Sequence, residues 1–248
     1  MNECTFRFYA QLNDFIDSVE KSRQLNYEFW GNPAVKDAIE AIGPPHTEVA
    51  LILINGEPVG LDRQLEPADR VSVFPIFERF QLDPSIYLVP EPLEQPLFIA
   101  DIHLGQLSRY LRMVGFSCLY RNDFEDSKLA QISAEQQRIL LTRDQELLKR
   151  SIVRRGYYLR SDQPKRQLVE VVARYQLVDR IEPFRLCMEC DGLLVRVAKE
   201  QVLDQLPGNV RQERQEFRQC SQCQRVYWGG SHVDQMQATI DWLIEQFA

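Results

Sequence analysis

The sequence has no long run of apolar residues. No stretch approaches the ~20 consecutive apolar residues that a membrane-spanning helix needs, and no apolar N-terminal run precedes a small-residue cleavage site. These absences argue against membrane insertion and against a secretion signal. We therefore expect a soluble cytoplasmic protein without a membrane partner.

Cysteine is scarce as well, with six residues in 248, and four of the six form two close pairs. Such a small and clustered set does not build a disulfide scaffold, so it fits a reducing compartment. Apolar residues make up 44% of the chain. A chain of this length and composition has room for one large domain or for two to three small ones, each with a core.

Charge is unevenly distributed. The net charge of −7 does not favour nucleic acid as a partner, but residues 1–80 contain 7 Lys/Arg against 13 Asp/Glu, whereas residues 103–225 contain 22 against 16. The middle of the chain is therefore basic, which points toward nucleic acid only in combination with other signals. A solvated surface with uneven charge explains the same counts.

Residues 1–80 predict a small β-rich domain. Apolar patterning predicts strands at 5–10, 27–30, 49–54 and 71–76, and Asn32-Pro33 predicts the start of a helix that Gly43 ends. The order of these elements is that of a β-grasp fold and resembles the small sulfur carriers of molybdopterin and thiamine synthesis. Those carriers act through a free C-terminal Gly-Gly, whereas this chain continues through 77–80. We therefore expect residues 1–80 to have a structural role or to dock a protein partner, and not to act as a carrier.

Residues 81–96 contain four prolines and predict an extended linker. They are Pro84, Pro90, Pro92 and Pro96. We place a domain boundary there and expect few contacts to cross it.

Strands and helices alternate in residues 97–182, which predicts an α/β domain with a mostly parallel sheet. The strands are expected at 97–100, 116–120, 138–141 and 156–159, and an aspartate follows each of them within a few residues. The first is Asp101, directly followed by a helical pattern that Gly115 ends.

Carboxylates at the ends of parallel strands converge on one edge of a sheet. We expect Asp101, Asp144 and one of Asp123 or Asp126, preferably Asp126, to form such a cluster. Close carboxylates repel one another unless a cation neutralises them, and hard oxygen ligands suit Mg²⁺ or Mn²⁺. These ions activate phosphodiester hydrolysis. The alternative is that each aspartate only caps the helix that follows it.

Basic residues accompany the aspartates and suit a phosphate backbone. They are Arg109, Arg112, Arg143, Lys149, Arg150, Arg154 and Arg155. Taken singly, each would equally well belong to a solvated helix face. His103 is a further candidate for substrate contact.

The two CxxC pairs predict a structural zinc site. Cys187 and Cys190 form the first pair, and Cys220 and Cys223 form the second. Four thiolates complete a tetrahedral zinc shell, so we expect a zinc ribbon at 183–232 with an extra hairpin or helix near 199–206. A final helix, 233–248, is expected to pack on the core. His232 precedes it and is expected to contact substrate or to hold a structural hydrogen bond.

Together these motifs resemble the Mut-seven C-terminal RNase domain, a PIN-like nuclease domain with an appended zinc ribbon. The matching pieces are Phe98–Asp101 with Leu104-Gly105, Leu111-Arg112, Gly115-Phe116, Asp126, Leu141–Asp144, the two CxxC pairs, and Tyr227-Trp228 with Gly230–His232. Residues 1–80 resemble the ubiquitin-like domain that is often fused to it in bacteria. The chain departs from the family pattern at His103, at Leu186 and at Asp191, where an apolar residue, Arg and Asn are expected.

The resemblance implies a metal-dependent ribonuclease with Asp101, Asp126 and Asp144 as catalytic metal ligands. It would hold RNA through Arg109, Arg112, Arg143 and His232. The alternative is a non-catalytic RNA-binding adaptor, in which the zinc ribbon grips RNA and residues 1–80 recruit a partner. Divalent-metal binding by the aspartates separates the two hypotheses.

Overall fold

The computed structural model describes residues 1–76, 86–88, 90 and 93–247. Pro84 and Pro92 of the predicted linker lie outside the described residues, as does the predicted continuation through 77–80. The chain groups into two compact units. Unit 1 comprises residues 1–94 and 125–158, and unit 2 comprises residues 95–124 and 159–248. The domain boundaries expected from the sequence, at 80, 96, 182 and 232, stay predictions.

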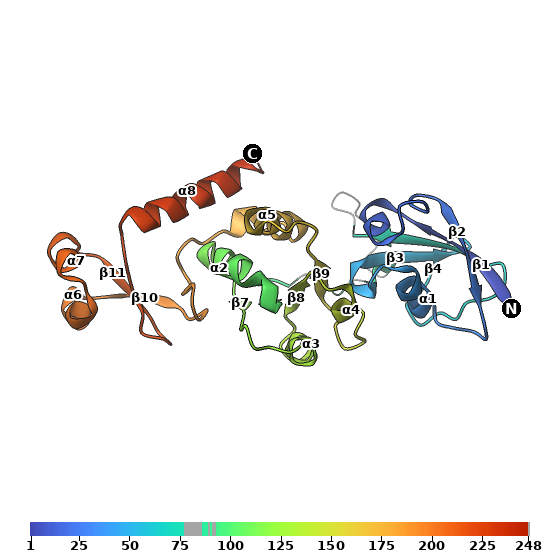
Figure 1. Cartoon of the computed structure of the whole chain (residues 1–248), viewed down its shortest axis with the longest axis horizontal. Coiled ribbons are helices and arrows are strands. Elements are labelled where there is room, and N and C mark those ends of the chain that lie inside the picture. The colour runs from blue at the N-terminus through green and yellow to red at the C-terminus, as the bar shows by residue number, and fades with distance from the viewer. Residues whose placement is uncertain (77–85, 89, 91–92, 248) are drawn as a thin grey trace. The chain divides into compact units, whose positions relative to one another are not determined.

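The N-terminal part of unit 1 is a five-stranded sheet with one helix, drawn in blue to cyan in Figure 1. Its strands are β1 (Asn2–Phe8), β2 (Gln24–Phe29), β3 (Val49–Ile54), β4 (Glu57–Pro58) and β5 (Arg70–Pro75), and its helix is α1 (Val35–Ile42). The strand order is β2-β1-β5-β3-β4, with β1 and β5 parallel and the other neighbours antiparallel. This arrangement confirms the predicted β-grasp fold.

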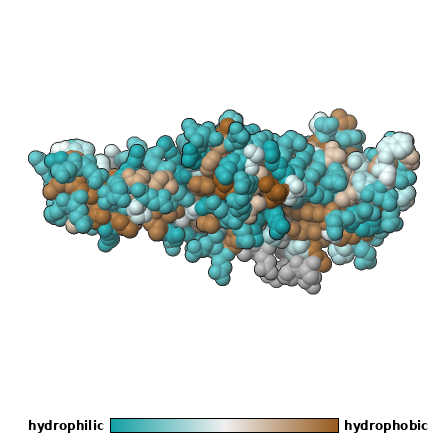
Figure 2. Space-filling model, turned by 90° about the horizontal axis from the view of Figure 1, so that it is seen from below, coloured by the Kyte–Doolittle hydropathy of each residue, from teal (hydrophilic) through white to brown (hydrophobic). Residues whose placement is uncertain are grey.

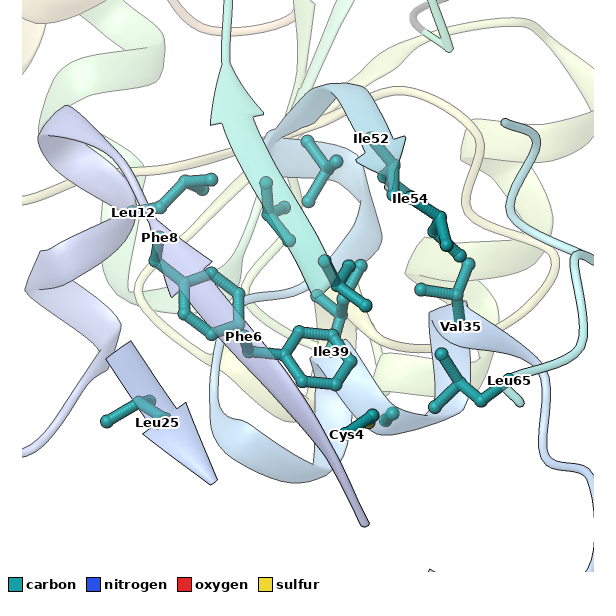
Figure 3. Packing of buried hydrophobic residues seen from close by; sticks show 14 of the residues in the cluster. Cys4, Phe6, Phe8, Leu12, Leu25, Val35, Ile39, Ile52, Ile54 and Leu65 are labelled. Atoms are coloured by element: carbon teal, nitrogen blue, oxygen red, sulfur yellow. The ribbon is translucent and has the colours of Figure 1, made fainter. Parts of the chain in front are cut away.

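One hydrophobic cluster joins the sheet to α1 (Figure 3). Phe6 and Phe8 alternate with more exposed residues along β1, so both side chains enter the core, where they meet Ile39 of α1 and Ile52 of β3. The period of two along the strand and the spacing of apolar residues in the helix bring these side chains to the same layer. Their burial is what holds the helix on the sheet.

Two local predictions in this part were wrong. The first strand lies at Asn2–Phe8 instead of 5–10, because the chain leaves the sheet after Phe8 and forms the 3-10 helix η1 (Ala10–Phe15). Asn32 does not cap α1. The chain stays extended through Ala34, which bridges to Gln64, and the helix begins at Val35. Gly43 does end α1, and a side chain at Gly43 would overlap the carbonyl oxygen of Phe15.

The second part of unit 1 contains α3 (Asp126–Glu135), β8 (Ile139–Thr142), α4 (Gln145–Leu148) and β9 (Gly156–Tyr158). Strands β8 and β9 pair in parallel, as the strand–helix alternation predicts. The two helices pack on them, since α3 and α4 contact β8 and α4 also contacts β9.

Contacts join the two parts of unit 1, contrary to the expectation of few. Glu48, at the end of the 3-10 helix η2 (His46–Glu48), is buried and accepts a hydrogen bond from the Tyr158 amide at 2.7 Å. The Nε2 atom of His46 lies 2.8 Å from the Val153 carbonyl oxygen, and Phe15 meets Tyr158 edge to face. The β-grasp part therefore supports β9 directly.

Unit 2 begins with β6 (Phe98–Ala100), the 3-10 helix η4 (Ile102–Leu104), α2 (Gly105–Met113) and β7 (Cys118–Leu119). It continues after residue 158 with α5 (Pro164–Arg174) and the 3-10 helix η5 (Val178–Arg180). Strands β6 and β7 are parallel, and α2 lies beside α5 (Figure 1). Leu107 and Leu111 of α2 are fully buried, as their helical spacing predicts.

A three-stranded antiparallel sheet follows in unit 2, with the order β10-β11-β12. Its strands are β10 (Leu194–Val197), β11 (Phe217–Cys220) and β12 (Val226–Trp228). The predicted extra element is present as α6 (Lys199–Val202), η6 (Leu203–Gln205) and α7 (Gly208–Glu213), and these pack on one face of the sheet through a small apolar cluster around Phe217. The long helix α8 (Ser231–Glu245) closes the chain, and its Trp242 ring lies 5.3 Å from the Lys165 ammonium of α5.

Hydrophilic side chains cover most of the face drawn in Figure 2, with hydrophobic ones scattered among them. Such scattering is ordinary for a protein surface. None of the helices in the described residues combines the length and the apolar character needed to cross a membrane.

Candidate functional site

The four cysteines of the CxxC pairs lie together in unit 2, and their Sγ atoms are all within 4.8 Å of one another. Cys187 and Cys223 are 3.6 Å apart at sulfur, and Cys190 and Cys220 are 3.3 Å apart. Tetrahedral zinc with Zn–S bonds of about 2.3 Å needs sulfurs about 3.8 Å apart. The cluster could therefore hold a metal ion such as zinc, and together with the three-stranded sheet it is consistent with a zinc ribbon.

The backbone around the cysteines is shaped for a closed ligand shell. The amides of Gln222 and Cys223 each lie 3.4 Å from Cys220 Sγ and donate to it. Asp191, directly after the first pair, adopts a left-handed conformation with φ of 69°. The next residue is Gly192, where a Cβ atom would come within 2.7 Å of Cys220 Sγ. A side chain at Gly192 would collide with a ligand sulfur.

The thiols do not all have the same acidity. Burial raises the pKa of Cys187, but hydrogen bonds from the Tyr227 hydroxyl, at 3.0 Å, and from the amides of Cys190 and Glu189 outweigh that effect and lower the pKa to about 7. Burial raises the pKa of Cys190 to about 12. The thiolate is the form that binds metal, and the hydrogen bonds to Cys187 favour that form.

Arg112 fastens the first CxxC loop to helix α2. Its side chain is buried, and its Nη1 atom donates to the carbonyl oxygens of Met188 and Glu189 at 2.9 and 3.0 Å. Its Nε and Nη2 atoms donate to the carbonyl oxygen of Cys118, in β7, at 2.9 and 2.7 Å. The guanidinium group is thus shared between the cysteine loop and the strand beside β6.

Asp191 completes this connection from the other side. Its carboxylate accepts hydrogen bonds from Ser117 Oγ at 2.5 Å and from the Cys118 amide at 3.2 Å, and it lies 3.6 Å from Arg112 Nε. Sequence reasoning assigned Arg112 to RNA and gave Asp191 no role. The sequence of α2 did contain a signal that Arg112 is buried. Arg112 lies one turn after Ser108, and both are next to the apolar positions Leu107 and Leu111, which are buried.

Asp101 lies where β6 ends, as expected. It is 8% exposed, and its Oδ1 atom accepts a hydrogen bond from the Ile102 amide at 2.5 Å, which caps η4. The hydroxyl of Tyr120 donates to the Ile102 carbonyl oxygen at 2.9 Å. A Cβ atom at Gly105 would come within 2.8 Å of that hydroxyl, so the glycine lets Tyr120 close over the turn that follows Asp101.

Asp126 and Asp144 lie in unit 1. Asp144 is exposed and caps α4, because its Oδ1 atom accepts hydrogen bonds from the amides of Glu146 and Leu147 at 2.8 and 3.4 Å. Asp126 is the first residue of α3, and its carboxylate lies 4.0 Å from Arg150. Asp101 and Asp144 therefore cap the helices that follow them, as the alternative interpretation of the sequence predicts. Asp126 does not, since Glu125 occupies the cap position of α3. Convergence of the three carboxylates stays a prediction.

The remaining candidate residues lie at the surface. Arg109 pairs with Glu189 at 3.2 Å, while Arg143, His103 and His232 are exposed. Asp123 is exposed and makes a two-pronged ion pair with Arg121, with contacts of 2.8 and 2.6 Å, and that partner lowers the pKa of Asp123. Asp123 therefore faces solvent.

Two family models match the chain. The Mut7-C RNAse domain matches residues 96–240, and the Mut7-C ubiquitin domain matches residues 1–81. None of the curated proteins matches it.

Three solved structures of small proteins are similar to about a third of the chain. Two are crystal structures of small archaeal modifier protein 1 from Haloferax volcanii, each 20% identical, with TM-scores of 0.25 and 0.26. They cover 30% and 31% of this chain and 98% of their own. The third, from Pyrococcus furiosus, is described as molybdopterin converting factor subunit 1; it is 22% identical, covers 30% of this chain and 98% of its own, and has a TM-score of 0.25.

Proposed function

Because this chain belongs to the Mut7-C RNAse domain family, we propose that it is a ribonuclease that hydrolyses RNA phosphodiester bonds with the help of divalent cations. The match over residues 96–240 is the observation that carries the proposal. It includes all three candidate aspartates, all four clustered cysteines and all seven of the candidate basic residues. The proposal includes a cytoplasmic location, where the cysteines stay reduced.

We assign Asp101, Asp126 and Asp144 as the ligands of the catalytic cation. Asp101 follows β6 and Asp144 follows β8, so each carboxylate stands at the C-terminal end of a strand that pairs in parallel with a neighbour. The helix caps engage Oδ1 of each residue, which fixes the orientation of both carboxylates. Mg²⁺ or Mn²⁺ bound there would polarise the phosphodiester and make a water molecule acidic enough to attack phosphorus.

We assign the exposed Arg109, Arg143 and His232 to the RNA backbone. Exposed basic side chains can reach phosphates, and such contacts position a nucleic acid without reading its sequence. Arg112 was in the same predicted set, but its buried guanidinium is directed to the carbonyl oxygens of Cys118, Met188 and Glu189. We therefore give it a positioning role.

The second candidate function is a non-catalytic RNA-binding adaptor. The observation that favours it is the capping by Asp101 and Asp144, because capping alone explains why an aspartate stands at each position. In either case residues 1–80 would dock a protein partner through the ubiquitin-like domain.

A cleavage assay tests the proposal. Labelled single-stranded RNA is incubated with the purified full-length protein in the presence of Mn²⁺, of Mg²⁺, or of neither. A hydrolase predicts fragments with either ion and intact RNA without them. Intact RNA under all three conditions, together with retained RNA binding, would support the adaptor.

We also propose that the four cysteines hold one structural zinc. The energy of metal binding at such a site is folding energy. Changing Cys190 to Ser should therefore release the metal and unfold the chain from about residue 185 onward, and metal analysis with amide exchange measures both effects. Wild-type protein that is folded and contains no zinc would rule the assignment out.

A further inference from the structure

A partly open pocket of about 320 Å³ lies within unit 2 at the β10-β11-β12 sheet. Arg196, Arg218 and Tyr227 share one face of the sheet and form its floor. Further lining comes from α2, from the first CxxC loop, from α8, and from Val197, Phe217 and Trp228 of the same strands. Three of the four methionines of the chain belong to this lining, namely Met113, Met188 and Met236. Methionine side chains adapt to differently shaped flat ligands.

The floor is a row of two cations and one aromatic ring. Arg196 in β10 is paired in register with Arg218 in β11, and Arg218 is paired with Tyr227 in β12. Residues directly opposite each other on neighbouring strands share a face, so the side chains of Arg196 and Arg218 start from adjacent positions on that face. Like charges in this relation are destabilising unless an anion lies between them or beside them.

The two arginines differ in what they already contact. Arg218 donates to the Phe184 carbonyl oxygen at 2.8 Å, which orients its side chain toward the pocket wall. Arg196 is exposed, and within the described part of the chain no carboxylate lies at ion-pair distance from it. Glu216 also lines the pocket, so the lining carries a net charge of one positive unit. The pocket thus offers an aromatic and apolar surface next to an unmatched cation.

We propose that this pocket binds one unstacked nucleotide of single-stranded RNA. The base lies against the Tyr227 ring between the methionine side chains, and the phosphate binds Arg196 beside Arg218. An aromatic platform next to a basic groove is how proteins hold single strands without sequence preference. The inference rests on the proposed function, to which it adds a contact outside the aspartate residues.

An apolar peptide is the other class of ligand that would fill such a pocket. It would cover the Arg196–Arg218 pair without supplying an anion, which makes it the poorer match. A nucleotide matches both halves of the lining, because its base is flat and apolar on its faces and its phosphate is anionic.

The test uses full-length protein without added Mg²⁺ or Mn²⁺ and measures binding by fluorescence anisotropy. One probe is a labelled single-stranded RNA, and the second has the same length and charge but carries tetrahydrofuran spacers instead of nucleosides. Stacking of one base predicts that the RNA binds about 5- to 150-fold more tightly than the spacer strand. Equal affinity for the two probes would overturn the proposal.

Two pairs of variants locate the contacts. Tyr227→Phe keeps the ring and should keep the preference for bases, whereas Tyr227→Leu should lose it. Arg196→Glu should weaken binding of both probes more than Arg180→Glu, which makes the same charge change at an exposed site away from the pocket. Equal effects of the two arginine variants would contradict the phosphate contact. The comparison of the two arginine variants stays informative even if Tyr227→Leu, whose hydroxyl contact to Cys187 is lost, releases the metal of the cysteine cluster.

The outcome is separable from that of the cleavage assay. If the protein cleaves RNA but binds both probes equally, the proposed nucleotide pocket is contradicted and the ribonuclease proposal is supported. If the protein cleaves no RNA but prefers the probe with bases, and Tyr227→Leu loses that preference, the nucleotide pocket is supported and the ribonuclease proposal is contradicted.

Discussion

At the scale of single residues, Asp101 and Asp144 have the same position in their local structures. Each follows the C-terminal end of a strand and caps a short helix, Asp101 through one backbone amide and Asp144 through two. An aspartate in such a position is held in one orientation, which a metal ligand requires and a simple cap also explains. Because Asn caps as well as Asp does, a change to Asn separates the two roles.

Cys4 provides a prediction of pH dependence. It is buried in the β-grasp core, and burial, together with the charges of Asp69 and Glu3, raises the pKa of its thiol to about 11. In the unfolded chain a thiol ionises at about pH 8.5, so the folded state holds the proton between about pH 8.5 and pH 11. The stability from the neutral thiol is complete below that window and falls as pH rises through it.

Changing Cys4 to Val removes this dependence. Between pH 8.5 and 10.5 the free energy of unfolding of the wild type should fall more than that of Cys4→Val, by about 1.4 kcal/mol for each pH unit. Urea unfolding at the two pH values measures the difference. Parallel curves for the two proteins would mean that the thiol ionises equally easily in the folded and unfolded chains.

At the scale of elements, the connection between α2, β7 and the first CxxC loop depends on Arg112. Changing Arg112 to Met keeps an apolar stem but leaves three carbonyl oxygens and Asp191 without their cation. Removing one partner of a buried pair costs roughly 3–5 kcal/mol. We expect that loss in urea unfolding, together with faster transfer of zinc to a colorimetric chelator.

Arg109→Met is the matched control, because Arg109 is on the same helix and pairs with Glu189 at the surface. An exposed pair contributes about 0–1 kcal/mol. Equal losses in the two variants would show that Arg112 does not fasten the loop.

Elements with a strong apolar period were predictable from the sequence, and contacts between them were not. Leu107 and Leu111 identify α2, and the alternation of Phe6 and Phe8 identifies β1, because burial fixes their spacing. The two CxxC pairs likewise predicted the cysteine cluster. The roles of Arg112 and Asp191 depend on residues about 75 positions apart in sequence, as with Arg112 and Met188, and no local period encodes such a contact.

At the scale of the whole molecule, the β-grasp part is more than an appendage on a linker. Glu48 and His46 support β9 and the loop before it within unit 1. A composition-based boundary at 81–96 could not show this, since the contacts come from residues before the prolines and reach residues after 150. The Mut7-C ubiquitin domain thus contacts part of the RNAse domain in the same unit.

Deleting residues 1–80 tests this dependence. The cysteine cluster belongs to unit 2, so the shortened protein should keep one zinc per chain. The amides of β8 and β9 should exchange faster with solvent. The deletion removes Glu48, which accepts the hydrogen bond of the Tyr158 amide, and Phe15, which packs against the Tyr158 ring. Glu48→Gln in the full chain is the milder comparison, and unchanged exchange in both proteins would show that the β-grasp part gives no support.

Three variants decide whether Asp101 and Asp144 hold a catalytic cation. RNA cleavage, RNA binding and thermal unfolding are measured for Asp101→Asn, for Asp144→Asn and for the control Asp123→Asn, whose carboxylate pairs with Arg121 in solvent. We predict that cleavage falls by orders of magnitude in the first two variants and is unchanged in the third. RNA binding should persist or tighten, since a carboxylate that repels phosphate is lost, and the unfolding temperature should hardly move. Full cleavage by both Asp101→Asn and Asp144→Asn, with a contaminating nuclease excluded, would contradict the claim and leave the RNA-binding adaptor.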